Sequence, residues 1–339
     1  MKTNFAKVMA AMFFILLLLS VLSLSWGQMD IPFTHVLDAM GSVAGIAPVH
    51  GLTPNEEAVI WHIRLPRTLV GLLTGAALAA AGATLQGLFA NPLADPAIIG
   101  VSSGASVGAI VAIATGFSAV TLFALPLCAL LGALLAVSLT IALAFRRGRI
   151  PVLTLLLAGV VVGMFLAAVA AMLLTALNEN KLQEYLFWTI GGLDYRRWEH
   201  VWLGLLPISL CVGFMCLLAR QLNILSLGET EAKAVGLPVI RFRLLFLFLA
   251  AFSTATGVCI SGNIGFVGLV VPHMLRMLIG PDHRRLLPAS VLAGGIFLLF
   301  CDVAGRVLWD GTEIRVGIMT AFIGTPYFLY LLRKQQRME

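Results

Sequence analysis

Two long apolar segments, residues 65–88 and 98–116, flank the sequence NPLADP at positions 91–96. At 1.5 Å per residue, each segment is long enough to cross a hydrocarbon core of about 30 Å. The two prolines and polar residues between them predict a turn that neither helix continues through. Glycines lie four residues apart at Gly71 and Gly75, and again at Gly100, Gly104 and Gly108, a spacing that lets helices approach closely in lipid. This stretch therefore predicts the packed centre of a polytopic membrane protein.

Composition supports a membrane location. Hydrophobic residues make up 60% of the chain and charged residues 11%, with a mean hydropathy of +1.00, whereas soluble domains carry about 25% charged residues. The net charge of +6 comes from short basic clusters at the ends of apolar segments, which favours membrane topology over nucleic-acid binding. The five cysteines lie within apolar runs and read as small buried hydrophobes, neither disulfides nor metal ligands. They are Cys128, Cys211, Cys216, Cys259 and Cys301.

The hydropathy pattern predicts an all-α protein with ten membrane crossings. The segments are 8–26, 65–88, 98–116, 119–145, 151–177, 201–219, 242–261, 264–280, 286–304 and 314–332. We interpret the first as a retained helix, because it is long for a signal peptide and is followed by a poor cleavage site. Residues 27–63 are expected to form a polar loop on the outer side, and residues 178–200 a second outer segment.

The distribution of basic residues fixes the orientation. With both termini cytoplasmic, the inner side holds fifteen lysines and arginines and the outer side seven, as the positive-inside rule requires. The inner residues are Lys2, Lys7, Arg146, Arg147, Arg149, Arg220, Lys233, Arg241, Arg243, Arg276, Arg284, Arg285, Arg333, Lys334 and Arg337. The outer residues are Arg64, Arg67, Lys181, Arg196, Arg197, Arg306 and Arg315.

The chain also contains an internal echo. Arg67 opens a small-residue helix that ends in LQGLFANPL, and Arg241 opens one that runs into GNIGFVGLVVPHML. The two openings lie five helices apart, an odd number, so the copies would be inverted in the membrane. We therefore expect helices two to five and seven to ten to form an inverted repeat.

Several motifs in fixed order resemble one family. They are RLPR at 64–67, NPLADP at 91–96, GVSSGA at 100–105, GETEAKAVGLP at 228–238, GNIGFVGLVVPHMLR at 262–276, and the closing pattern from Glu313 to Gly324-Thr325-Pro326. They are similar to the FecCD-type permease subunits of ATP-binding cassette importers for iron chelates, haem and vitamin B12. The resemblance implies one permease domain over residues 1–339, with a cytoplasmic coupling segment within 220–241. It also implies a homodimer in the cytoplasmic membrane of a bacterium or archaeon.

Energy coupling requires a partner protein. No lysine of the chain follows a glycine as a Walker A motif demands, so ATP and magnesium would be bound by separate ATPase subunits, two per complex. Acidic residues early in GETEAKAVGLP, then Gly236 and Pro238, predict a short capped helix. Such a helix could simply close a connection; the resemblance makes it the segment that grips the ATPase. The residues concerned are Gly228, Glu229, Thr230, Glu231, Ala232, Lys233, Gly236, Leu237 and Pro238.

Two outer arginines, Arg64 and Arg306, lie at the mouths of the second and ninth helices. By residue type they are interfacial anchors. In the resembled family, arginines here pair with glutamates on the two lobes of a periplasmic or lipid-anchored substrate-binding protein. Asp302 lies one turn before Arg306, so an ion pair between them is expected.

The inner ends of the helices hold the candidate gate. Resemblance places Asn91 and Leu93 there, together with Val152 and Leu153 at the start of the fifth helix, where the family often has hydroxyl residues. From the residues alone, Asn91 and Asp95 either line a pathway or cap helix ends.

No arrangement in the sequence argues for an enzyme or a metal centre. The histidines lack metal-ligand spacing, and a structural hydrogen-bonding role is expected for His273, the one histidine inside a long apolar segment. The resemblance therefore implies an importer permease that binds no cofactor itself and translocates an iron chelate, either a ferric siderophore or haem. The alternatives are vitamin B12 import or an ion-coupled secondary transporter, which would need ionisable residues at the bilayer midplane.

Overall fold

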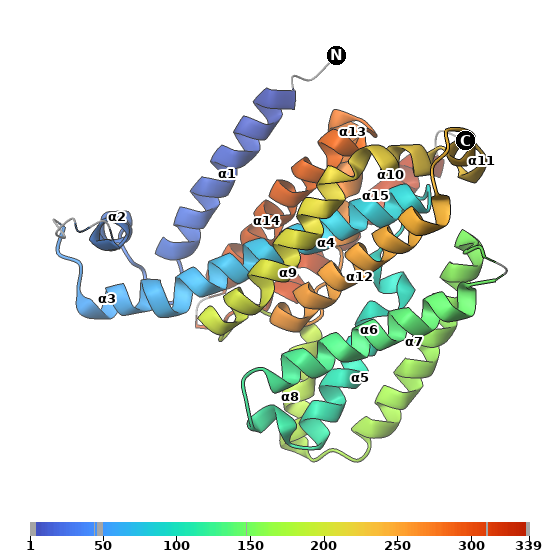
Figure 1. Cartoon of the computed structure of the whole chain (residues 1–339). Coiled ribbons are helices and arrows are strands. Elements are labelled where there is room, and N and C mark those ends of the chain that lie inside the picture. The colour runs from blue at the N-terminus through green and yellow to red at the C-terminus, as the bar shows by residue number, and fades with distance from the viewer. Residues whose placement is uncertain (1–4, 44, 46–49, 147, 310, 337–339) are drawn as a thin grey trace.

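The computed structural model describes residues 5–43, 45, 50–146, 148–309 and 311–336 (Figure 1). Among these residues all regular elements are helices, and seven are long and apolar enough to span a membrane. The seven contain α1 (Phe5–Ser25), α4 (Leu65–Leu88), α6 (Ala124–Ala144), α7 (Val152–Leu174), α9 (Trp198–Leu217), α12 (Val239–Ser261) and α14 (His283–Val307). Three further helices have shorter apolar stretches: α5 (Val101–Ala114), α13 (Val267–Ile279) and α15 (Val316–Gln336), which is apolar over Val316–Tyr330. These ten helices correspond to the ten predicted crossings, which confirms the all-α polytopic fold.

The outer loop predicted at 27–63 is largely helical. It contains α2 (Phe33–Val43) and α3 (Pro54–Val59), and α3 continues through a π-helical turn, Ile60–Arg64, directly into α4. A capping box starts α3, because the Thr53 hydroxyl accepts from the Glu56 amide and the Glu56 carboxylate accepts from the Thr53 amide. Figure 1 shows α2 and α3 projecting beyond the other helices at the outer end. The second crossing therefore begins about ten residues earlier than predicted.

Two crossings are shorter than predicted. The segment 98–116 becomes a short 3-10 helix, Pro96–Ile99, followed by α5, and 264–280 becomes α13 alone. A Cβ at Gly268 would lie 2.9 Å from the Leu78 carbonyl oxygen and 3.1 Å from Pro96. Leu78 is ten residues, about 15 Å, from the inner end of α4. Both irregular connections therefore reach the middle of α4.

The remaining boundaries differ by smaller amounts. The outer segment 178–200 contains α8 (Glu179–Ile190), and the crossing predicted at 201–219 becomes α9 followed by α10 (Ala219–Ser226). The other predicted crossings shift by at most a few residues at either end, apart from 119–145, whose helix starts at Ala124.

Small residues bring the central helices together as predicted. A Cβ at Gly75 of α4 would lie 2.2 Å from the Gly294 carbonyl oxygen of α14, and one at Gly82 only 1.9 Å from the Gly268 carbonyl oxygen of α13. No side chain fits at such distances, so these glycines set the spacing of the helices. Helix α4 is the buried axis of the bundle and also packs against α9 and α12.

The helix contacts match the predicted inverted repeat. In the first copy, α5 and α6 pack together, and in the second copy α13 and α14 do. The first helix of each copy packs against the pair of the other copy: α4 lies against α13 and α14, and α12 lies against α5 and α6. The two copies are thus interlocked through their leading helices.

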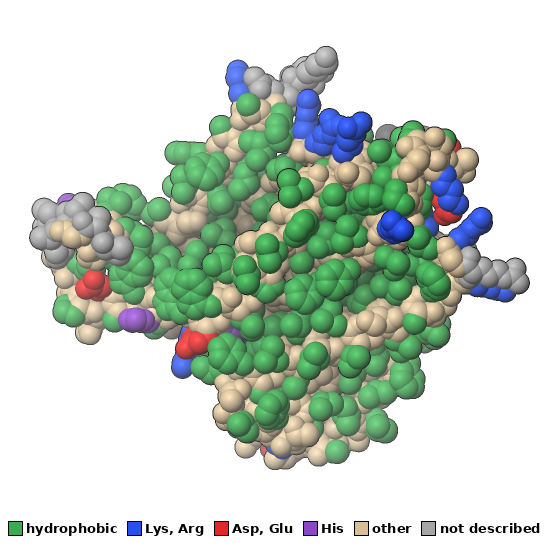
Figure 2. Space-filling model, in the orientation of Figure 1, with side chains coloured by type: hydrophobic (Ala, Val, Ile, Leu, Met, Phe, Trp, Pro, Cys, Tyr) green, Lys and Arg blue, Asp and Glu red, His purple; other side chains and the backbone are tan. Residues whose placement is uncertain are grey.

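The surface has the polarity of a membrane protein. Hydrophobic side chains cover the flank of the bundle in Figure 2, and lysine and arginine side chains gather near the end that carries α11 (Glu229–Ala234) and the C-terminus. This agrees with the predicted cytoplasmic side. Lys2, Arg147 and Arg337, which belong to the predicted inner set, lie outside the described residues.

Candidate functional site

The coupling segment predicted at 228–238 folds as the short helix α11, which follows α10 at the inner end of the bundle (Figure 1). Glu229 and Glu231 lie in its first turn, where the helix dipole favours negative charge. Gly236 follows the last turn with φ of +78°, the left-handed conformation expected of a glycine after a helix. The predicted capped helix is therefore present, and its contact with an ATPase stays a prediction.

One acidic residue connects α11 to the rest of the bundle. The Glu229 carboxylate pairs with the exposed Lys233 at 2.6 Å and with the buried Arg243 guanidinium of α12 at 3.3 Å. The hydrogen bond from Lys233, helped by the charge of Arg243, holds the pKa of Glu229 below its usual range. Arg243 Nη1 also donates to the Ile150 carbonyl oxygen at 2.8 Å, two residues before α7 begins.

A second polar contact holds α10. The Asn223 side-chain amide donates to the Asp282 carboxylate at 2.6 Å, and its oxygen accepts from the His283 backbone amide at 2.9 Å. Asp282 is the N-cap of α14, whose middle packs on α4. Helix α10 is therefore fixed to the central helices.

Exposed apolar side chains flank the coupling helix. Leu227 is 70% exposed and Val235 is 67% exposed, just before and just after α11. Both lie on the inner side, where water would surround them in an isolated chain. Large apolar side chains in such a position are typical of a protein–protein interface.

The predicted gate residues lie on two different elements. Asn91 accepts from the Leu93 amide at 2.9 Å and Asp95 accepts from the Ala97 amide at 2.8 Å, so both side chains cap local turns. Val152 is half-buried at the start of α7, whereas Leu153 beside it is 70% exposed. Asp95 thus caps the short 3-10 helix Pro96–Ile99, as one alternative from the sequence had it, whereas Asn91 closes a turn and caps no helix. The gate assignment stays a prediction.

The two predicted docking arginines are buried beneath the outer end of α1. Arg64 is 5% exposed and donates to the carbonyl oxygens of Leu24 at 2.6 Å and Ser25 at 2.7 Å, and also to that of Met29. Arg306 is 6% exposed and donates to the carbonyl oxygens of Ser23 and Trp26, both at 3.0 Å. The two guanidinium groups therefore cap the C-terminal carbonyls of α1.

The place of Arg64 also differs from the prediction. It lies within the continuous helix formed by α3 and α4, because that helix begins at Pro54, and it is not at a helix mouth. Arg306 keeps its place in the last turn of α14. It lines an outer hollow of about 500 Å³ together with Trp26 and Trp309. The predicted ion pair between Arg306 and Asp302 is present at 3.1 Å.

Arg67 forms an ionic cluster that the sequence analysis did not anticipate. Its guanidinium contacts the carboxylates of Asp302 at 2.8 Å, Glu313 at 2.8 Å and Asp194 at 3.3 Å. Burial raises the pKa of the Asp194 carboxyl, and the charges of Arg67 and Arg315 oppose that rise. The cluster joins the outer ends of α4 and α14 to the segments that precede α9 and α15.

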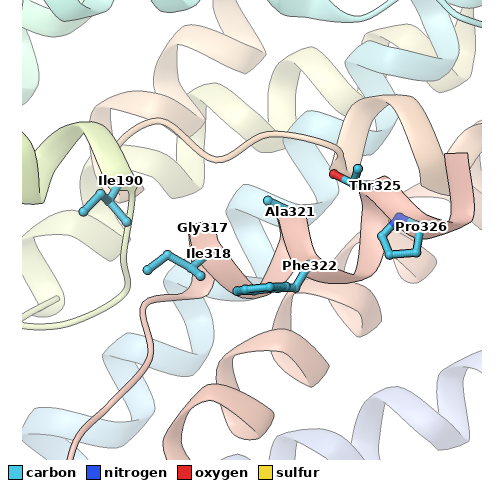
Figure 3. A pocket seen from close by; sticks show the side chains of 7 residues that line it. All are labelled: Ile190, Gly317, Ile318, Ala321, Phe322, Thr325 and Pro326. Atoms are coloured by element: carbon cyan, nitrogen blue, oxygen red, sulfur yellow. The ribbon is translucent and has the colours of Figure 1, made fainter. Parts of the chain in front are cut away.

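An apolar hollow of about 580 Å³ runs along one side of α15. Figure 3 shows its lining residues on successive turns of α15, with Ile190 of α8 beside them. They are Ile190, Gly317, Ile318, Ala321, Phe322, Thr325 and Pro326. The hollow is open, and Phe322 is 70% exposed in it.

Other candidate groups show no site. Among the described residues no group of three or more His, Cys, Asp or Glu side chains is placed to hold a metal ion, and all five cysteines are free thiols. The hydrogen-bonding role expected of His273 is not confirmed at Nδ1, which is buried without a partner.

Comparisons with known proteins agree with this architecture. The sequence pattern described as the FecCD transport family matches residues 15–334. The chain is 41% identical over 294 residues to the vitamin B12 import system permease protein BtuC of Citrobacter koseri, covering 86% of this chain and 88% of the relative. It is 42% identical to the cobalamin import system permease protein BtuC of Halobacterium salinarum, covering 87% and 79%.

Two solved structures are similar. One, described as a metal-chelate type ABC transporter in an inward-facing conformation, superposes with a TM-score of 0.86 at 35% identity, covering 97% of this chain and 99% of that one. The other, PsaBC from Streptococcus pneumoniae in complex with Fab, gives a TM-score of 0.57 at 16% identity, covering 81% and 92%, and shows a shared fold alone.

Proposed function

Since this chain belongs to the FecCD transport family, we propose that it is the permease subunit of an ATP-binding cassette importer in the cytoplasmic membrane. The observation that carries the proposal is the coupling helix α11 at the inner side of a multi-pass bundle. The exposed side chains of Leu227 and Val235 flank this helix. A secondary transporter has no need of such a surface. The chain itself is a transport component, and ATP hydrolysis falls to its partner.

The proposed substrate is cobalamin. Relatives that are 41% and 42% identical over most of the chain are named as vitamin B12 or cobalamin permeases. This replaces the iron chelate favoured by the sequence as first choice. An iron chelate remains the second candidate, because the similar solved structure at 35% identity is described as a metal-chelate type transporter.

The proposed assembly contains two copies of this chain. Helix α7 has an exposed apolar face that includes Leu157, Val161 and Met164, and the hollow along α15 is apolar as well. Packed against a second copy, these faces would enclose a route for a bulky solute with few charged groups to trap it. Two ATPase subunits would then bind the two α11 helices.

The binding protein is expected on the outer side. Arg306 lines the outer hollow, so a glutamate of a binding protein could enter there and meet a positive charge. Arg64 is covered by the backbone of residues 24–29. Its predicted contact with a binding protein would therefore require that segment to move.

Reconstitution into proteoliposomes with the cognate ATPase tests this function. We expect the ATPase to copurify with the chain, and cobalamin-loaded binding protein to stimulate ATP hydrolysis and uptake more than ferric siderophore or haem. Glu229→Ala/Glu231→Ala should abolish stimulation. The matched control is Glu179→Ala/Glu184→Ala, which removes two exposed glutamates from the outer helix α8. Uptake driven by a proton or sodium gradient without any ATPase would instead establish the secondary transporter.

A further inference from the structure

Arg243 lies where three elements meet at the inner end of the bundle. It belongs to the first turn of α12 and is 8% exposed. Its Nη1 atom donates to the Ile150 carbonyl oxygen at 2.8 Å and pairs with Glu229 of α11 at 3.3 Å. One guanidinium group thus joins the coupling helix, α12 and the residues that lead into α7.

The carbonyl that Arg243 holds is well placed to set the position of α7. Ile150 precedes Pro151, the N-cap of α7, and its own side chain is completely buried. Proline fixes its backbone angle φ and gives the chain little freedom at this point. A shift of the Ile150 carbonyl is therefore passed directly to the first turn of α7, where Val152 and Leu153 lie.

Helix α7 is free to follow such a shift. Only 17% of its most apolar 18-residue stretch is buried, against 78% for α4 and α12. Within one copy of the chain, α7 packs against α5, α6 and the short 3-10 helix Pro96–Ile99. Its opposite face is exposed. Within one copy, few contacts therefore oppose movement of its inner end, and the exposed face of α7 is the one proposed to meet the second copy.

Apolar contacts also join α11, α12 and the residues before α7, but they do not fix the relative position of these elements. Ala232 of α11 and Ile150 are both completely buried in one apolar cluster with Val239 of α12. Such packing keeps the elements together but permits sliding, whereas a guanidinium bonded on both sides fixes their relative position. The bonds of Arg243 are therefore the contacts that make α11 and the start of α7 move together.

We infer that Arg243 is the positioning residue that passes movement of the coupling helix to the inner end of α7. The inference rests on the proposed function, since movement of α11 requires an ATPase bound to it. In an importer, this link makes the inner end of α7 move whenever the ATPase moves the coupling helix. Without it, the ATPase would still bind and hydrolyse ATP while α7 lagged behind.

The test compares solute taken up per ATP hydrolysed in proteoliposomes for wild type, Arg243→Ala, Arg243→Gln and Arg241→Ala. Arg241 is exposed on the same turn, which makes it a matched control. We expect Arg243→Ala to copurify with the ATPase and hydrolyse ATP nearly as wild type. Its uptake per ATP should fall about tenfold, the factor set by loss of a hydrogen bond to a charged group. Arg243→Gln, which keeps a donor for the Ile150 carbonyl, should lie between the two.

Two results would overturn the inference. If uptake and hydrolysis fall together and the thermal midpoint of the purified chain falls with them, Arg243 serves folding alone. If uptake per ATP is unchanged in both variants, α7 is moved by other contacts. A wild-type chain that recruits no ATPase is a different outcome, because it refutes the proposed function before any Arg243 variant is compared.

Discussion

The outer and inner ends of the bundle are held together in different ways. At the outer end, Arg67 contacts the carboxylates of Asp194, Asp302 and Glu313, and Asp302 is 2% exposed. At the inner end, the coupling helix is held by Glu229, whose side chain is 33% exposed. Buried charges with several partners resist separation, while a pair with one partly exposed member contributes less to stability. The contrast indicates an outer end that is locked and an inner end that can be moved.

Removing the centre of the outer cluster should have the largest effect. Arg67→Ala leaves the buried carboxylate of Asp302 with one partner fewer, and breaking a buried pair costs about 3 to 5 kcal/mol. We expect a strong loss of monodisperse protein and a lower thermal midpoint in detergent. Arg315→Ala, whose contact with Asp194 is 3.8 Å, is the milder control. A wild-type midpoint for Arg67→Ala would remove the distinction between the two ends.

The second largest effect is expected when the outer end of α1 is released. Arg306→Ala removes the donor to the carbonyl oxygens of Ser23 and Trp26, and each hydrogen bond to a charged group is worth about 1.5 to 3 kcal/mol. With the five native cysteines replaced, a cysteine introduced at Ser25 should resist a membrane-impermeant maleimide from outside. Adding Arg306→Ala should make it reactive. If that thiol stays protected, Arg306 is not needed at the end of α1, and the bonds of Arg64 to Leu24 and Ser25 hold it alone.

Substitutions of the two acidic residues of α11 should have different effects. Glu229→Gln weakens the link to Arg243, while Glu231 is exposed and is bonded to neither Arg243 nor Lys233. We expect Glu229→Gln to lower uptake per ATP severalfold. Its thermal midpoint should fall less than that of Arg67→Ala, because the side chain at position 229 is partly exposed and an amide can still accept a hydrogen bond from Arg243. Glu231→Gln should weaken ATPase copurification and leave uptake per bound ATPase intact. Identical behaviour of the two variants contradicts this division.

The smallest effect is expected for Lys233→Ala. The pair with Glu229 spans one helical turn, its lysine is 51% exposed, and such pairs contribute about 0.3 to 0.5 kcal/mol. Thermal midpoint and uptake should match wild type within error. A large loss of uptake would mean that Lys233 contacts the ATPase itself.

Much of the fold could be predicted because the membrane constrains it so strongly. Ten apolar segments, their orientation and the close contact at Gly75 follow from hydropathy, basic residues and small-residue spacing. The extension of α4 back to Pro54 was missed because its cap, Thr53 with Glu56, lies in a stretch that reads as a polar loop. The short lengths of α5 and α13 depend on packing against the middle of α4.

The site was only partly predictable. The coupling helix follows from its acidic first turn and Gly236. Neither Arg67 nor Arg243 was assigned a bonding partner, because the partners lie far away in sequence: Asp302 for Arg67 and the Ile150 carbonyl for Arg243. A signal was present for Arg67 in the acidic residues at outer helix ends. For Arg243 the partner is a backbone atom, which no residue pattern reveals.

The most direct test of a movable inner end is the distance between Lys233, whose replacement should leave uptake unchanged, and Leu153. Their side chains are exposed and accept spin labels. Labelled subunits are diluted with unlabelled ones, assembled with the ATPase and measured by pulsed electron paramagnetic resonance with and without ATP. The account predicts one narrow distance in both states, because Arg243 makes α11 and the start of α7 move together. In Arg243→Ala the distance should change or broaden when ATP binds. A wild-type distance that changes with ATP as much as that of the variant would contradict the account.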